Sequence, residues 1–143
     1  RGELSREQRI SFLVAKEGLI EVAEFLKHEF GLDVVVDVCA VDNLRDSKFA
    51  ISYHVTSYSN TVLSGTLVQL TVEIDRSNPA TPTLIPVWNS VEYHEREQAE
   101  MYGITFEGHP NLSLLLLPED WVGIPPMRKE YKLPQPYEEG YPQ

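Results

Sequence analysis

The sequence predicts an α+β fold: a two-layer sandwich in the order β-α-β-β-β-α-α, with an extended proline-rich C-terminal arm. Three patterns indicate it: an amphipathic helix after a first strand, three runs rich in β-branched and aromatic residues, and helical segments before the prolines. A chain of 143 residues has the size of one domain. We therefore expect an α+β domain over residues 1–107, with its helices on one sheet face, and an arm over residues 108–143.

The first expected elements are a strand over residues 9–14 and a helix over residues 16–30. The strand segment alternates loosely between polar and apolar side chains. In the helix, apolar residues recur three and four positions apart, opposite charged residues. This apolar face consists of Leu19, Ile20, Val22, Ala23, Leu26 and Phe30. Gly31 should end the helix, because glycine readily adopts the left-handed conformation found at helix C-termini.

Three further strands are expected over residues 34–41, 49–58 and 63–74. Each run is rich in β-branched and aromatic residues, and short polar segments separate them. From Val68 onward the third run alternates between apolar and polar residues, which indicates one buried and one exposed face. Short hairpin-like connections between these strands follow from the short separating segments.

Two helices are expected after the strands. A turn over residues 75–79 precedes a short helix over residues 82–88. Asn89 or Ser90 then caps a second helix that continues to Tyr102, because side chains of this type accept a hydrogen bond from the first free N–H groups of a helix. Gly103 follows as the stop signal.

The segment from Gly108 onward has no periodic pattern and contains many prolines, which break regular elements. Large apolar and aromatic side chains are spread among these prolines: Trp121, Met127, Tyr131, Leu133, Tyr137 and Tyr141. Disordered tails are typically poor in aromatic residues, whereas Trp and Tyr are enriched at interface hot spots. We therefore expect an arm that docks on a partner rather than a disordered tail.

Composition excludes several classes of function. A formal net charge of -10 with scattered basic residues argues against nucleic-acid binding. One cysteine and four histidines exclude a thiolate-bound iron–sulfur cluster and disfavour a structural zinc site. We expect that cysteine, Cys39, to be a small buried hydrophobe. The longest apolar runs, such as residues 114–118, are too short to span a bilayer, so membrane contact would come only through partners.

The charged window over residues 92–102 does not match a catalytic motif. The pair His94-Glu95 could begin the helix motif of zinc proteases, which needs a second histidine four residues after the first. Position 98 is Gln98, so the motif is absent. The plain alternative is a solvated helix face on which Arg96 lies one turn from Glu92 and Glu100. Glu97 and Glu100 show no sign of converging on a pocket as catalytic carboxylates do.

Other catalytic signatures are missing from the sequence as well. The sequence has neither a glycine-rich nucleotide loop nor a Gly-x-Ser-x-Gly elbow. His109 should lie at a turn, either as a hydrogen-bonded loop residue or as a partner contact, with metal binding the least favoured role.

One continuous block, residues 95–110, reads EREQAEMYGITFEGHP. It resembles the signature of the 30 kDa (C) subunit family of respiratory complex I, NADH:quinone oxidoreductase. Segments 78–88, 116–123 and 128–131 agree with the same family in order and spacing. The resemblance thus covers residues 78–131 well and the first half only by its element order. Ser113 and Ile124 depart from the family pattern, which leaves the branch of the superfamily open.

The resemblance implies structural and partner-contacting roles and no catalytic, cofactor-binding or metal-binding residues. The residues implied to form the corner between helix and arm are Glu95, Arg96, Glu97, Glu100, Gly103, His109 and Pro110. The residues implied to dock or pin the arm are Trp121, Arg128, Lys129 and Tyr131. Tyr102, Pro118, Glu119 and Asp120 belong to the same motif segments and are implied to be structural or partner-contacting.

The resemblance also implies a non-catalytic subunit that supports electron transfer from NADH to quinone, coupled to ion translocation. Its expected partners are the hydrogenase-like large (D) subunit and an iron–sulfur (B) subunit, on the cytoplasmic face of the membrane. Iron–sulfur clusters and a flavin or F420 are expected on the partners and no cofactor on this chain. An equivalent subunit of an F420H2 dehydrogenase or a membrane-bound [NiFe] hydrogenase, and a soluble interaction adaptor, remain alternatives.

Overall fold

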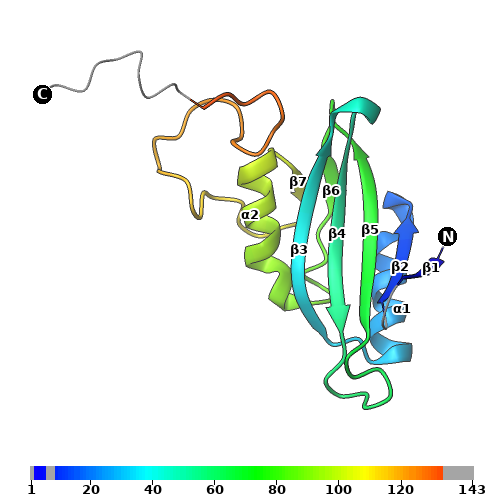
Figure 1. Ribbon diagram of the computed structural model, residues 1–143. Coiled ribbons are helices and arrows are strands. Elements are labelled where there is room, and N and C mark those ends of the chain that lie inside the picture. The colour runs from blue at the N-terminus through cyan, green and yellow to red at the C-terminus, as the bar shows by residue number, and fades with distance from the viewer. Residues whose placement is uncertain (1, 6–8, 134–143) are drawn as a thin grey trace, which may run out of the picture.

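The computed structural model describes residues 2–5 and 9–133 and contains one five-stranded sheet (Figure 1). Its strand order is β1-β2-β5-β4-β3. The strands are β1 (Gly2–Ser5), β2 (Arg9–Val14), β3 (Val34–Asn43), β4 (Lys48–Thr56) and β5 (Leu67–Asp75). In this sheet β2 and β5 pair in parallel, and the other neighbours are antiparallel. The α+β class predicted from the sequence is confirmed.

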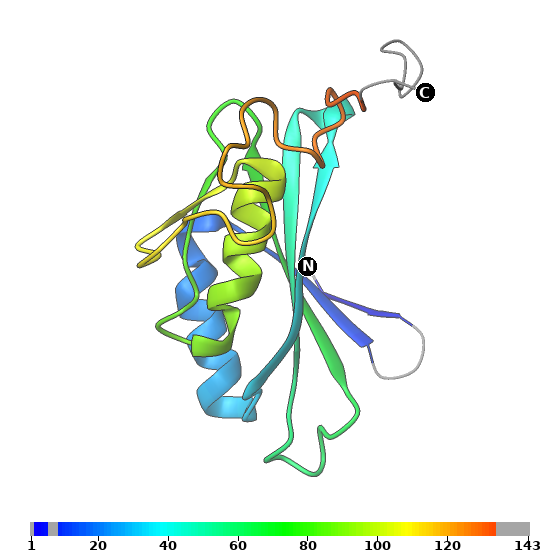
Figure 2. The same ribbon diagram turned by 90° about the vertical axis from the view of Figure 1, so that its left-hand side faces the viewer.

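Helices α1 (Leu19–Phe30) and α2 (Glu92–Tyr102) lie on the same face of the sheet (Figure 2). A short 3₁₀ helix, η1 (Lys16–Gly18), precedes α1. Gly31 has a φ of 66° and ends α1 as predicted. The predicted apolar face is only partly buried, because Ile20 and Phe30 are exposed. The core lies between the helices and the sheet; its large buried side chains include Phe49, Ile51, Tyr53, Leu70, Leu84 and Phe106.

The prediction of a short helix over residues 82–88 is wrong. Strand β6 (Ala80–Pro82) instead pairs in parallel with β7 (Thr105–Glu107), and the two strands flank α2 in the sequence. Main-chain hydrogen bonds from Thr105 N to Pro79 O and from Thr83 N to Glu107 O extend this pairing. A 3₁₀ helix, η3 (Asn89–Val91), leads directly into α2. The observed order of strands and α-helices is β-β-α-β-β-β-β-α-β. It differs from the predicted β-α-β-β-β-α-α, because a strand and a turn replace the sixth element and β1 and β7 are additional strands.

A bulge in β3 sets which side chains face the helices. Pairing with β4 shifts register between Val35 and Asp37. Val35 and Val38 are both buried, so Asp37 and Cys39 lie on the face opposite the helices. Cys39 is only partly buried and lies among polar residues of that face. The prediction that Cys39 is a small buried hydrophobe is therefore wrong. Another 3₁₀ helix, η2 (Leu44–Asp46), connects β3 to β4.

Residues 108–133, called the arm below, form no helix or strand in the structure. The arm runs past the C-terminal end of α2 and reaches the end of the sheet near η2 (Figure 2). The division into segments 1–107 and 108–143 remains a prediction, and Tyr137 and Tyr141 fall outside the described residues. Among the residues described, no helix is long and apolar enough to cross a membrane.

Candidate functional site: the corner between helix α2 and the arm

Helix α2 is rich in charges but much of it is buried. Glu95, Gln98 and Glu100 all lie in the interior or under the arm. Gln98 accepts a hydrogen bond from the main-chain N–H of Ala40 at the edge strand β3, at 3.0 Å. The alternative of a solvated helix face is therefore wrong for Glu95, Gln98 and Glu100, which are all buried.

The Glu95 carboxylate connects α2 to β4 and to the segment after β6. It accepts hydrogen bonds from the Tyr53 hydroxyl at 3.0 Å, the Leu84 N–H at 2.8 Å and the Thr83 hydroxyl. Burial raises the pKa of Glu95, although these hydrogen bonds and the nearby His109 favour its charged form. Burial and the charge of Glu95 raise the pKa of Tyr53 well above its ordinary value. Glu95 thus faces the interior and holds the helix in place.

Arg96 and Glu100 fix the first part of the arm. The Arg96 guanidinium donates to the carbonyl oxygens of Ser113 and Leu114 and to the Ser113 hydroxyl. The Glu100 carboxylate accepts the main-chain N–H groups of Leu115 at 2.8 Å, Leu116 at 2.9 Å and Leu117 at 3.4 Å. Charge-assisted hydrogen bonds of this kind are stronger than neutral ones. The two side chains therefore bind the arm mainly through its backbone.

The leucines of this segment are partly exposed. The N–H groups of Leu115 and Leu116 turn toward Glu100, and the side chains of Leu114, Leu115 and Leu116 are 37%, 37% and 61% exposed. Further exposed apolar residues follow along the arm: Val122, Ile124, Met127 and Leu133. Contiguous apolar side chains left in solvent mark interaction sites on soluble proteins.

The second half of the arm meets the C-terminal end of α2. Gly103 has a φ of 70° and its N–H bonds to Ala99 O at 2.8 Å. A Cβ at this position would lie 3.0 Å from Arg128 Nη2 and 3.1 Å from Pro125 Cγ. Arg128 donates to the Tyr102 carbonyl at 2.6 Å, and its guanidinium lies 5.2 Å from the centre of the Phe49 ring. Glycine is thus required both by the helix end and by the close approach of the arm.

Asp42, at the end of β3, connects the sheet to the arm. Its buried carboxylate binds Arg76 through two hydrogen bonds, at 2.7 and 3.0 Å, and accepts the Lys129 N–H at 2.9 Å. Arg76 also pairs with Glu130. Burial alone would raise the pKa of Asp42, but the hydrogen bonds from Arg76 and Lys129 and the charges of Arg76 and Arg128 lower it.

His109 fixes the turn where the arm begins. Its Nδ1 accepts the Asn111 N–H at 3.1 Å, which assigns the proton to Nε2, and Nε2 lies 3.0 Å from the Glu92 carbonyl that accepts it. His109 is thus a hydrogen-bonded turn residue, and its contact with a partner stays a prediction. Pro110 beside it is exposed.

The remaining predicted site residues are not all brought to the corner. Trp121 and Tyr131 pack together with ring centres 5.9 Å apart and hold two parts of the arm to each other. Pro118, Glu119 and Asp120 lie on the turn that precedes Trp121, where both acidic side chains are exposed. Glu97 is partly buried and lines a hollow between α2 and β3 rather than binding the arm.

Sequence reasoning missed Asp42, Arg76, Phe49 and Glu130. Local patterns place Asp42 and Arg76 in turns, because polar residues at the end of a strand commonly signal one. The role of Asp42 depends on contacts between residues far apart in the sequence, such as its bond from Lys129. Arg76 and Arg128 both lie over the Phe49 ring, and no local sequence signal indicates that arrangement.

A family model described as the respiratory-chain NADH dehydrogenase 30 kDa subunit matches residues 12–137. The C subunit of NADH-quinone oxidoreductase from Roseiflexus sp. (strain RS-1) is 39% identical over 127 residues, covering 87% of this chain and 70% of that protein. The chloroplastic J subunit of NAD(P)H-quinone oxidoreductase from Arabis hirsuta is 38% identical over 109 residues, covering 76% and 68%. The family match therefore includes α2, the corner and the described arm.

Solved structures show the same fold. A trypsin-resistant fragment of Nqo5 superposes with a TM-score of 0.69 at 26% identity, covering 78% of this chain and 89% of the fragment. A chain of the membrane-bound sulfane sulfur reductase, an archaeal respiratory membrane complex, gives a TM-score of 0.81 at 23% identity, covering 93% and 77%. The second likeness indicates the fold alone.

Proposed function

Since this chain belongs to the respiratory-chain NADH dehydrogenase 30 kDa subunit family, we propose that it is the C subunit of an NADH-quinone oxidoreductase. In this role it is a structural subunit of the peripheral part of complex I, and electron transfer from NADH to quinone occurs on other chains. The complex is membrane-associated, and this subunit lies on its cytoplasmic face. Iron–sulfur clusters and a flavin belong to the partners.

One observation supports the structural role: main-chain groups hold the first part of the arm to the domain, while several of its apolar side chains are exposed. Glu100 and Arg96 bind main-chain groups of residues 113–117, and Leu116 remains 61% exposed. Such an arrangement presents a preorganised apolar surface, so little conformational entropy is lost when a partner binds. The hydrogenase-like large subunit and the iron–sulfur subunit are the proposed occupants.

The test is affinity purification of the tagged chain from its source membranes in mild detergent, with mass spectrometry of the partners and a metal assay. We expect the large subunit and iron–sulfur subunits to co-purify. Leu116→Arg should reduce their recovery several-fold, because it places a charge in an apolar interface. The matched control is Val62→Arg, which changes another exposed apolar residue, in the loop between β4 and β5.

The donor-side subunits in the same sample identify the branch of the superfamily. NADH-oxidising subunits support the proposal, whereas F420H2-oxidising or hydrogenase subunits assign the chain to one of the related complexes. Recovery of the chain alone, without iron–sulfur proteins, would overturn the structural-subunit proposal and favour a soluble adaptor.

A further inference from the structure

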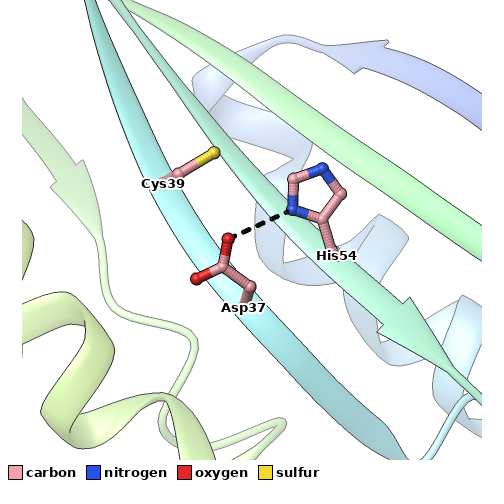
Figure 3. A group of neighbouring side chains, drawn as sticks. All are labelled: Asp37, Cys39 and His54. Atoms are coloured by element: carbon pink, nitrogen blue, oxygen red, sulfur yellow. Dashed lines mark ion pairs between the residues drawn. The ribbon is translucent and has the colours of Figure 1, made fainter.

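A cluster of three metal-ligand side chains lies on the sheet face opposite the helices, away from the corner and the arm's leucines. Asp37 and Cys39 come from β3 and His54 from the neighbouring strand β4 (Figure 3). One donor atom from each residue lies within 4.8 Å of the other two. His54 Nδ1 is 3.8 Å from an Asp37 carboxylate oxygen. The cluster unites a thiol, an imidazole and a carboxylate, which are the side chains that bind zinc in proteins.

The backbone aims these side chains at one another. Asp37 pairs directly with His54 in the antiparallel ladder, and Cys39 pairs with Ser52, two residues away on the same face. The bulge between Val35 and Asp37 determines which face of the sheet Asp37 and Cys39 occupy. An uninterrupted strand with Val35 buried would turn both side chains toward the core. Bulges of this kind commonly re-aim a side chain toward a functional site.

The donor atoms are available for a ligand. Within residues 2–5 and 9–133, no hydrogen bond engages the Cys39 thiol or either ring nitrogen of His54, whereas the neighbouring Ser52, Gln69 and Thr71 bond to one another.

We propose that Asp37, Cys39 and His54 form a binding site for a divalent transition-metal ion, with Zn²⁺ the best fit. Zinc bonds of about 2.0–2.3 Å place the donor atoms of one tetrahedral ion about 3–4 Å apart. The observed separations approach this range, and the exposed Asp37 side chain is free to close the difference. Three protein ligands leave the fourth position to water.

The site differs from the zinc sites that sequence patterns reveal. Two of its ligands are two residues apart on one strand and the third lies on the next strand, so the sheet register alone unites them. Cys39 binds the ion as a thiolate, so metal binding releases the thiol proton to solvent. The expectation of no metal on this chain rests on the missing short-spaced Cys and His pairs.

The test uses Co²⁺ as a probe, because the filled d shell of zinc gives no d–d spectrum. Titration of the untagged 143-residue chain should give a thiolate-to-cobalt absorption band in the near ultraviolet that saturates at one ion per chain. Zn²⁺ should displace the cobalt. Cys39→Ser should abolish the band, and His54→Gln should weaken binding at least about tenfold.

His28→Gln is the matched control, since His28 is exposed on α1 and outside the cluster. It should bind cobalt as the unchanged chain does. The proposal fails if the band is absent, if it persists in Cys39→Ser, or if His28→Gln weakens binding as much as His54→Gln. Far-ultraviolet circular dichroism checks that each variant is folded, and if Cys39→Ser does not fold, His54→Gln against His28→Gln decides.

Discussion

At the scale of single residues, the buried carboxylates of this protein serve as hydrogen-bond acceptors at junctions between segments. Glu95, Glu100 and Asp42 are all at least nine-tenths buried. Each accepts at least one main-chain N–H group from another segment. Because a buried carboxylate left without such partners is strongly destabilising, each position tightly constrains the residue that can occupy it.

Replacement of Glu100 by Ala should release the first part of the arm. The N–H groups of Leu115 and Leu116 lose their acceptor, and hydrogen bonds to a charged group contribute about 1.5–3 kcal/mol each. We expect amide hydrogen exchange of residues 113–117 to become at least tenfold faster, as measured by mass spectrometry. Glu97→Ala should leave this exchange unchanged, because Glu97 lines the hollow beside β3 instead. Equal protection in both variants would contradict the role of Glu100.

Glu95 should make the protein more stable as the pH falls toward its ordinary pKa. Its folded-state pKa is raised, so the native state holds the proton more tightly than the unfolded state. The stability gained from this proton is fully present below pH 4.5 and is lost as the pH rises through the folded-state pKa. Urea unfolding at several pH values should show this dependence, and Glu95→Gln should remove it. A variant with the same pH profile as the unchanged chain would refute the assignment.

Sequence reasoning identified the residues of the corner only through the family resemblance. Local patterns assign Arg96 and Glu100 to pairing within the helix, because residues four apart on a helix are neighbours. In the structure these side chains instead bind main-chain groups of the arm, because those groups have no hydrogen-bond partner in a helix or strand. Asp42 and the cluster of Asp37, Cys39 and His54 were not identified, because strand register is invisible in one sequence.

At the scale of elements, periodic segments were predicted well and short ones were not. Helices α1 and α2 and strands β2 to β5 have strong patterns and lie close to their expected positions. Strands β6 and β7 have three residues each, too few to show a period. Pro82, which local preference places at the start of a helix, lies at the end of β6, where pairing with β7 outweighs that preference.

The end of α2 depends on Gly103. Gly103→Ala should lower the unfolding free energy by about 1–2 kcal/mol, because an L residue at a φ of 70° is strained and the new Cβ meets Arg128 and Pro125. Denaturant unfolding measures the change. Gly18→Ala is the control, since Gly18 lies before α1 with a negative φ and an added Cβ there would meet nothing within 4 Å. Similar effects at both positions would argue against the special role of Gly103.

At the scale of the whole molecule, the arm and the domain form one unit through few, specific contacts. The arm is bound at Glu100 and Arg96, at the end of α2 and at Asp42, and its apolar side chains remain available between these points. This arrangement agrees with the proposed role of a structural subunit, since the binding surface is shaped before the partner binds.

The contact between Asp42 and the arm should respond to acid. The pKa of Asp42 in the folded state is lower than its ordinary value of 3.8. The stability that the charged Asp42 contributes is therefore present above pH 3.8 and is lost as the pH falls through the folded-state pKa. Asp42→Asn removes the charge that binds Arg76 and weakens the acceptor of the Lys129 N–H. We expect lower stability at neutral pH, a flatter acid-unfolding profile and faster tryptic cleavage after Arg128. Asp120→Asn, a change at an exposed acidic residue of the arm, should alter none of the three. If Asp42→Asn destabilised the domain without accelerating cleavage after Arg128, the link between sheet and arm would be refuted while the role of Asp42 within the sheet remained.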